Sequence, residues 1–133
     1  LPAIGNIVTN LMIVCDRYVT EFLPKAKKKF VRPPARLRCG VARGQIVSIG
    51  NGEDFVGPCI NIASRLQKLS QLSFACQRRG FNPEECFPAQ AVANELVVKK
   101  ISIRGIGEEE LVIIDKREFQ KLSREDKAIF KNP

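Results

Sequence analysis

Apolar residues recur every three or four positions along the first thirty residues of the chain. This spacing predicts a helix from Ile4 to Phe30 that packs against a core. Pro24 lies inside the span and should break or kink the helix, because proline has no N–H to donate. Pro33 and Pro34 then favour an extended lead into the next element. The side chains expected in the core are Ile7, Leu11, Val14, Tyr18 and Phe22.

Alternating apolar and polar residues predict two short strands after these prolines. The first covers Leu37–Val41 and the second Val47–Ile49, and an Arg-Gly turn joins them, so we expect two adjacent strands of a hairpin. An Asn-Gly turn follows and leads into a short run at 54–56. Gly57 suits an N-cap and Pro58 the first helical position, which predicts a helix beginning at Pro58.

The helix that begins at Pro58 carries two rows of side chains. Ile62, Leu66 and Leu69 recur at helical spacing and should form its buried stripe. Asn61, Arg65 and Lys68 precede them by one position, along the edge of the buried face. This polar row is either an ordinary solvated edge or a site for a ribose and a phosphoryl charge, since an amide and a guanidinium lie one turn apart near a Gly-rich turn.

The remaining sequence predicts a mostly β region and a charged end. A loop with turn residues separates a short strand from a brief helix, and two longer strands around a turn are expected to pair antiparallel. The end of the chain is charged and weakly helical, typical of a surface segment. The expected elements are a strand at 72–75, a helix within 83–92, strands at 95–103 and 110–115, and the surface segment at 123–131.

Composition is that of a soluble globular protein. The chain has 133 residues, 44% hydrophobic and 27% charged, which suits one domain with a core. No apolar run approaches the roughly 18 residues of a membrane span, and no basic leader opens the chain, so we expect a cytoplasmic protein without membrane contact. The first residue is Leu rather than Met, which suggests a fragment of a longer protein.

Cysteine and histidine usage excludes several chemistries. Five cysteines, an odd number without a C-x-x-C pair, indicate reduced and mostly buried thiols. The absence of histidine removes the usual general base and gives little support to a zinc site. Any catalysis by this chain would therefore have to rest on electrostatic interactions.

The net charge of +8 is concentrated between Lys25 and Arg38, where no acidic residue occurs. Such a stretch could contact the phosphates of a nucleic acid. Aromatic residues are sparse in it and no nucleic-acid-binding motif is present, so we favour a solvated connection between helix and strand.

The order of residues from Leu37 to Leu69 resembles a known signature. G-V-A-R-G-Q-I-V-S-I-G, then Asp54, then G-x-x-x-N-x-A-S-R-L, is similar to the catalytic domain of the class III nucleotidyl (adenylate and guanylate) cyclases. The resemblance continues more loosely to about Ile114. It implies attack of a ribose 3′-hydroxyl on the α-phosphate of a nucleoside triphosphate, giving a cyclic nucleotide and pyrophosphate.

The resemblance assigns roles to four residues. As catalytic residues, Asn61 would orient the ribose and Arg65 would stabilise the charge of the transition state. Asp54 would select the purine, and an aspartate there resembles the adenine-preferring members, so we favour ATP over GTP. Arg104, directly before a glycine, would bind the polyphosphate. The alternatives are a turn-capping acid for Asp54 and an exposed strand-end arginine for Arg104.

One half of the family's site is not visible. Class III cyclases hold two Mg²⁺ or Mn²⁺ ions with two aspartates on earlier strands, and this chain shows no such motif; Asp16 lies in a helical context and is not promoted to a ligand. Each family site forms at a head-to-tail dimer interface, from a homodimer or a cyclase partner domain. We therefore predict that this chain alone is inactive. A regulatory or nucleotide-sensing module and a basic nucleic-acid-binding domain remain as alternatives.

The expected fold class is α/β in the broad sense, a ferredoxin-like cyclase homology domain that lacks its N-terminal strands. Its mostly antiparallel sheet would carry packed helices and expose an edge. We divide this single partial domain into a helix at 1–30, the signature hairpin and helix at 35–69, C-terminal strands at 70–116 and a surface tail at 117–133.

Overall fold

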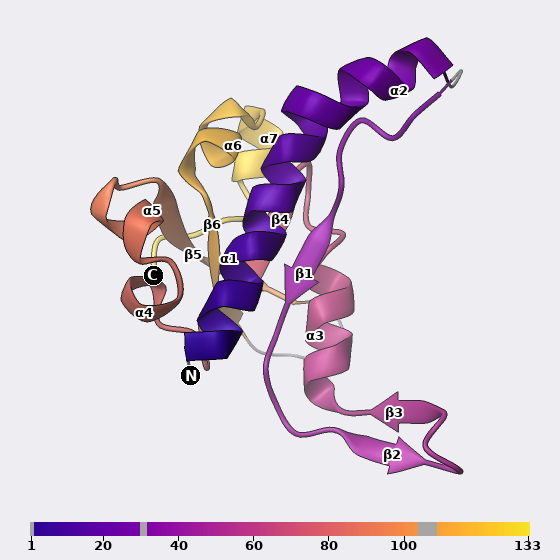
Figure 1. Cartoon of the computed structure of the whole chain (residues 1–133). Helices are drawn as coiled ribbons and strands as arrows, with labels where there is room; N and C mark the ends of the chain where they lie inside the picture. The colour runs from indigo at the N-terminus through magenta and orange to yellow at the C-terminus, as the bar shows by residue number, and fades with distance from the viewer. Residues whose placement is uncertain (1, 30–31, 104–108) are drawn as a thin grey trace.

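The computed structural model describes residues 2–29, 32–103 and 109–133; for residues 2–5 this covers the backbone alone. A helical N-terminal segment is followed by strands and helices that are interspersed to the end of the chain (Figure 1). The helical elements are α1 (Pro2–Arg17), the π-helical turn η1 (Tyr18–Phe22), α2 (Leu23–Lys29), α3 (Pro58–Leu66), α4 (Pro83–Cys86), α5 (Pro88–Val92), α6 (Lys116–Lys121) and α7 (Arg124–Lys127). The strands are β1 (Cys39–Val41), β2 (Val47–Ile49), β3 (Asp54–Val56), β4 (Phe74–Gln77), β5 (Leu96–Ser102) and β6 (Glu109–Asp115).

The main sheet has four strands in the order β1-β4-β6-β5. β1 runs parallel to β4, whereas β4 pairs with β6 and β6 with β5 in antiparallel fashion. The sequence prediction of a mixed fold with a mostly antiparallel sheet and packed helices is confirmed at this level. The predicted antiparallel pair of long strands is confirmed as β5 and β6, and the strand expected at 72–75 lies two residues later, as β4.

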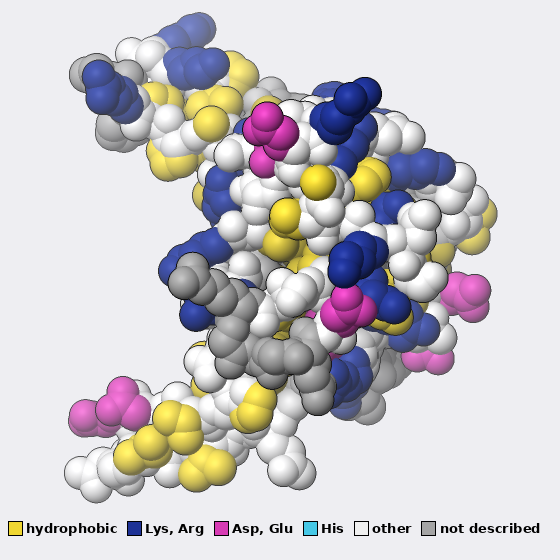
Figure 2. All heavy atoms as spheres, turned by 180° about the vertical axis from the view of Figure 1, so that it is seen from behind, with side chains coloured by type: hydrophobic (Ala, Val, Ile, Leu, Met, Phe, Trp, Pro, Cys, Tyr) yellow, Lys and Arg dark blue, Asp and Glu magenta, His cyan; other side chains and the backbone are white. Residues whose placement is uncertain are grey.

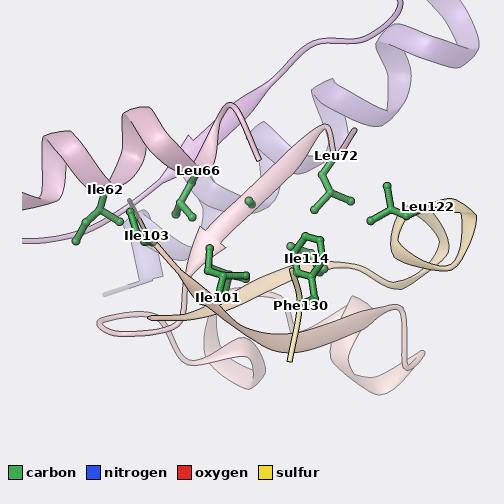
Figure 3. Packing of buried hydrophobic residues seen from close by; sticks show 10 residues of the cluster. Ile62, Leu66, Leu72, Ile101, Ile103, Ile114, Leu122 and Phe130 are labelled. Carbon is green, nitrogen blue, oxygen red and sulfur yellow. The ribbon is translucent and has the colours of Figure 1, made fainter. Parts of the chain in front are cut away.

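Helices cover both faces of this sheet. On one face, Ile62 and Leu66 of α3 pack with Ala75, Val112 and other residues of a buried cluster (Figure 3). On the other face, Val8 and Met12 of α1 pack against Phe74, and the aromatic rings of Phe74 and Phe87 meet edge-on at 6.0 Å. Because successive strand residues point to opposite faces, β4 and β6 contribute to both clusters.

The prediction for the core-facing side of the N-terminal helix is wrong. Ile7, Leu11, Val14 and Phe22 are exposed and Tyr18 is half-buried, whereas Val8, Met12 and Cys15 are buried. The helix is apolar around more than half of its circumference, so spacing alone does not decide which side meets the sheet.

Pro24 does not break the helix. The backbone stays helical from Pro2 to Lys29, and the wide turn η1 ends at Phe22, two residues before Pro24. A π-helical turn relieves the missing hydrogen bond and the ring clash without ending the helix. α2 extends beyond the sheet (Figure 1).

The predicted pairing of the two signature strands is also wrong. β1 pairs with β4 and not with β2, and the hairpin is formed by β2 and β3, with Val47 opposite Val56. β1 lies against α3, whereas the β2–β3 hairpin projects away from the main sheet (Figure 1). The predicted helix start is confirmed, with Gly57 as N-cap and Pro58 in the first turn.

The C-terminal segment carries buried residues as well as exposed ones. Leu122 and Phe130 belong to the cluster on the α3 face, and the ring of Phe130 meets that of Phe119 edge-on at 5.5 Å. Lys131 pairs with Lys100 in a short bridge, so this segment covers the outer side of β5. The expected surface segment therefore also protects a sheet edge.

Candidate functional site

Helix α3 carries the two residues expected to be catalytic, and its position depends on Gly40. A Cβ atom on Gly40 would lie 2.3 Å from the carbonyl oxygen of Ala63 and 2.5 Å from the nitrogen of Gln67. Only glycine lets β1 approach α3 so closely. At the other end of the helix, a Cβ on Gly57 would lie 2.5 Å from the Gln45 carbonyl oxygen. Two glycines of the signature thus fix α3 against the chain that precedes it.

Asn61 and Arg65 lie on the exposed side of α3. Ile62 and Leu66 are 5% and 2% exposed, as the sequence predicted, whereas Asn61 and Arg65, which were expected at the edge of the buried face, are exposed. Residues four apart on a helix have Cβ atoms roughly 6 Å from each other. Within the described part of the chain, neither side chain makes a hydrogen bond or ion pair, so an amide and a guanidinium stand side by side and free to bind a ligand.

Asp54 and Arg104 stand differently. Asp54 lies at the start of β3, opposite Ile49, and is exposed on the projecting hairpin. Among the described residues, no hydrogen bond or ion pair joins Asp54 to Asn61 or Arg65, although Asp54 lies only a few residues before α3 in the chain. Arg104 lies outside the described residues.

A cavity of about 760 Å³ opens between α1 and the segment of α6 and α7. Met12, Cys15 and Phe74 line it on one side, and Glu118 and Leu122 on the other. None of Asp54, Asn61 and Arg65 lines it. Its polar groups are partly engaged, because the Glu118 carboxylate accepts from the Ser73 N–H at 3.2 Å and so ties α6 to the strand end.

The basic stretch is divided by the structure into two parts. Arg36 donates to the carbonyl oxygen of Gln71, and Arg38 to that of Ser70 at 2.9 Å. These arginines therefore fasten the lead-in segment to the turn after α3. The lysines of α2 remain exposed at the far end of the helix: Lys25, Lys27, Lys28 and Lys29. This division supports the interpretation of the stretch as a connection between helix and strand.

Three of the cysteines, Cys39, Cys76 and Cys86, lie on the α1 face of the sheet, and Cys15 of α1 meets Cys39 there, whereas Cys59 lies on α3. All five are free, and Cys15 and Cys76 are buried. A hydrogen bond from Cys15 lowers the pKa of Cys39 to about 7, and the same contact, together with burial, raises the pKa of Cys15. Burial raises the pKa of Cys76 to about 12. Cys39 is therefore the thiol that ionises most easily of these three.

A buried polar network was missed by the sequence prediction. Glu110 is 4% exposed; its carboxylate accepts from Gln77 at 3.3 Å and pairs with Arg79. Gln77 also accepts from the backbone N–H of Arg43, at 3.4 Å. The network thus connects the chain after β1 to the ends of β4 and β6. A charged residue at an inward position of a predicted strand was the only sequence signal for it.

The fold defines the chain as a mixed α/β protein with a mostly antiparallel, four-stranded sheet. No family model, no curated protein and no solved structure matches it. In the described ranges, no three or more His, Cys, Asp or Glu side chains gather where they could hold a metal ion. Over the same ranges, no helix has the length and apolar character needed to cross a membrane.

Proposed function

We propose that this chain supplies the Asn/Arg half of a class III nucleotidyl cyclase site, which converts ATP to cyclic AMP and pyrophosphate. One observation carries the proposal: Asn61 and Arg65 are exposed, one turn apart and without a partner in the described chain, on a helix that Gly40 fixes against the sheet. The resemblance of residues 37–69 to the cyclase signature supplies the substrate and the reaction. The ferredoxin-like cyclase fold is part of the same proposal.

The chain's own residues act by binding and orientation. Asn61 holds the ribose so that its 3′-hydroxyl lies in line with the α-phosphate, which lowers the entropic cost of the attack. Arg65 donates to the α-phosphate as negative charge develops on it, and loss of one such preorganised donor costs about 2.7–4 kcal/mol in barrier height. Asp54 accepts a hydrogen bond from the adenine amino group, and Arg104 binds the polyphosphate.

The Mg²⁺ or Mn²⁺ ions of the family do not fit the described residues, which offer no carboxylate cluster for them. We assign no step to a metal held by this chain. The metal half of the site would come from a partner domain or from the second subunit of a head-to-tail dimer. A catalytically inactive, nucleotide-sensing module would use the same Asn61 and Arg65 without that half.

Calorimetric titration with Mg²⁺-ATP tests the proposal. Arg65→Ala should weaken ATP binding roughly tenfold or more, because a hydrogen bond to a charged group contributes about 1.5–3 kcal/mol. Arg124→Ala is the matched control, since Arg124 is also exposed and basic but lies on α7, outside the polar row of α3. Equal loss of affinity in the two variants, or no ATP binding at all, would remove the support for a nucleotide site on α3.

Turnover separates the enzyme from the sensor. The chain alone should produce no cyclic AMP from ATP with Mg²⁺ or Mn²⁺. Turnover that Arg65→Ala abolishes would contradict the predicted inactivity and establish a complete site. ATP binding that persists without turnover, even when a metal-bearing cyclase domain is added, would favour the sensing module.

A further inference from the structure

Two thiols from distant parts of the chain meet where α1 covers the sheet. Cys39 of β1 lies opposite Phe74 in the pairing of β1 with β4, and both pack on the α1 face. Met12 of α1 packs in the same cluster as Phe74, and Cys15 follows Met12 by three positions, on the same side of the helix. This packing brings Cys15 to Cys39, and their thiols form a hydrogen bond.

The other three cysteines are placed differently. The thiols of Cys76 and Cys59 each donate to a backbone carbonyl oxygen, at 3.5 and 3.9 Å. Cys86 lies at the end of α4. All five cysteines belong to the described residues and are free. Cys15 and Cys39 are thus a pair of reduced thiols that the fold itself holds in contact.

A small molecule reaches this pair from the cavity between α1 and the segment of α6 and α7. Cys15 is only 4% exposed, yet it lines this cavity of about 760 Å³. A water molecule occupies roughly 30 Å³ of liquid volume, and hydrogen peroxide has one oxygen atom more, so the cavity has room for it. This route from solvent to the thiols does not cross the edge of the sheet at β1.

Of the two thiols, Cys39 is the nucleophile. The hydrogen bond from Cys15 lowers the pKa of Cys39 to about 7, so a large share of this side chain is thiolate at neutral pH. Oxidation by peroxide follows thiolate character and access. Cys39 therefore reacts first, and Cys15 lies beside the product.

We propose that Cys15 and Cys39 form a peroxide-responsive pair that closes to an intramolecular disulfide. The Cys39 thiolate attacks one oxygen of hydrogen peroxide; the O–O bond breaks, hydroxide leaves, and Cys39 becomes a sulfenic acid. The Cys15 sulfur then attacks the Cys39 sulfur; the S–O bond breaks, and the hydroxyl group leaves with the Cys15 proton as water. The two sulfur atoms are oxidised, and the peroxide is reduced to hydroxide and water.

Oxidation of Cys39 also prepares Cys15 for the second step. The hydrogen bond with Cys39 is the main cause that raises the pKa of Cys15, followed by burial and by the charges of Cys39 and Glu118. Once Cys39 is a sulfenic acid, its sulfur no longer carries the thiolate charge. Cys15 then ionises more easily than in the reduced pair, so the same contact sets the order of the two steps.

The disulfide would tie α1 to β1. Gly40 directly follows Cys39 and packs against the backbone of α3, so the new bond would join α1 to the strand on which α3 rests. The chemistry needs only the two thiols and the peroxide. It therefore stands or falls separately from the proposed ATP site.

Peptide mapping after peroxide treatment tests the inference. The reduced chain is treated with an equimolar amount of hydrogen peroxide, alkylated, and digested with trypsin without reduction. We expect a disulfide that joins the tryptic peptides of residues 1–17 and 39–43, and dithiothreitol should release it. Both thiols found alkylated, or Cys39 found only as sulfinic acid, would overturn the inference.

Two variants test the pairing. Cys15→Ala should give no linked peptides, and dimedone should trap Cys39 as the sulfenic acid, because no thiol lies beside it. Cys59→Ser is the matched control: Cys59 is half-buried like Cys39 but lies on α3, so this variant should form the linked peptides as the parent chain does. Equal loss of the link in both variants would contradict the pairing.

Isotope labelling separates this disulfide from one between copies. Cys59 lies at the start of α3, next to the β2–β3 hairpin, on which Figure 2 shows hydrophobic side chains gathered. Copies that associate through this hairpin would join cysteines of different chains. In an equal mixture of labelled and unlabelled chains, the proposed disulfide joins peptides of one label only. Linked peptides of mixed label, or links through Cys59, would contradict the inference.

Discussion

The thiol of Cys39 differs from those of Cys15 and Cys76 in having a lowered pKa, and the cause is its neighbour Cys15. The hydrogen bond from Cys15 stabilises the Cys39 thiolate and lowers its pKa to about 7, although burial acts in the opposite direction. Since this pKa lies below that of the unfolded chain, the ionised group favours the folded state. Its contribution to the free energy of unfolding is therefore present above about pH 9 and is lost as the pH falls through 7.

The rate of alkylation measures this ionisation directly. Iodoacetamide reacts with thiolates, so the pH profile of Cys39 modification, followed by peptide mass spectrometry, should have its midpoint near pH 7. In Cys15→Ala the midpoint should move toward 9, because the donor is gone. An unchanged midpoint in that variant would show that Cys15 is not the cause of the shift.

Predictions for single residues succeeded where the sequence pattern determined both that a helix forms and which side of that helix is buried. The burial of Ile62 and Leu66 followed from helical spacing, and the structure confirms it, whereas Asn61 and Arg65 are more exposed than their predicted place at the edge of the buried face. Leu69 is only half-buried, since α3 ends at Leu66. The contact between Cys15 and Cys39 could not be predicted, because it joins two elements whose relative position depends on the whole fold.

The packing of β1 on α3 is the element-scale feature on which the candidate site depends. Gly40→Ala would force the Cβ against the Ala63 backbone, and overpacking of this kind costs about 1–3 kcal/mol or more. We expect a lower urea midpoint and weaker ATP binding. Gly50→Ala is the matched control: a Cβ there meets nothing within 4 Å, although the positive φ of 67° adds some strain. A Gly40→Ala loss no larger than that of Gly50→Ala would contradict this role.

Predictions for whole elements failed where the sequence pattern allowed a strand to pair with either of two other strands. Short alternating runs predicted strands at 37–41 and 47–49 correctly in kind, but proximity in the chain suggested a pairing that the structure does not have. β1 instead joins β4, which is buried on both faces and lies more than thirty residues later. Such long-range pairing depends on packing and is not encoded in local alternation.

At the scale of the whole molecule, three exposed features remain beyond a well-packed sheet with helices on both faces. They are the exposed apolar residues Ile7, Leu11 and Val14 of α1, the projecting β2–β3 hairpin, and the lysine-rich end of α2. Figure 1 shows how the hairpin and α2 project from the rest of the chain. The sequence predicted the basic stretch and an open sheet edge. It did not predict which strand forms that edge, because the edge depends on the order of strands in the sheet.

The central claim is that α3 presents a nucleotide site, and mapping of ATP binding by NMR tests it most directly. Backbone amide shifts recorded during titration with Mg²⁺-ATP should change around Asn61 and Arg65, with smaller changes near Asp54. Arg65→Ala should abolish the changes on α3. Shifts confined to the lysines of α2, or no shifts at saturating ATP, would contradict the claim.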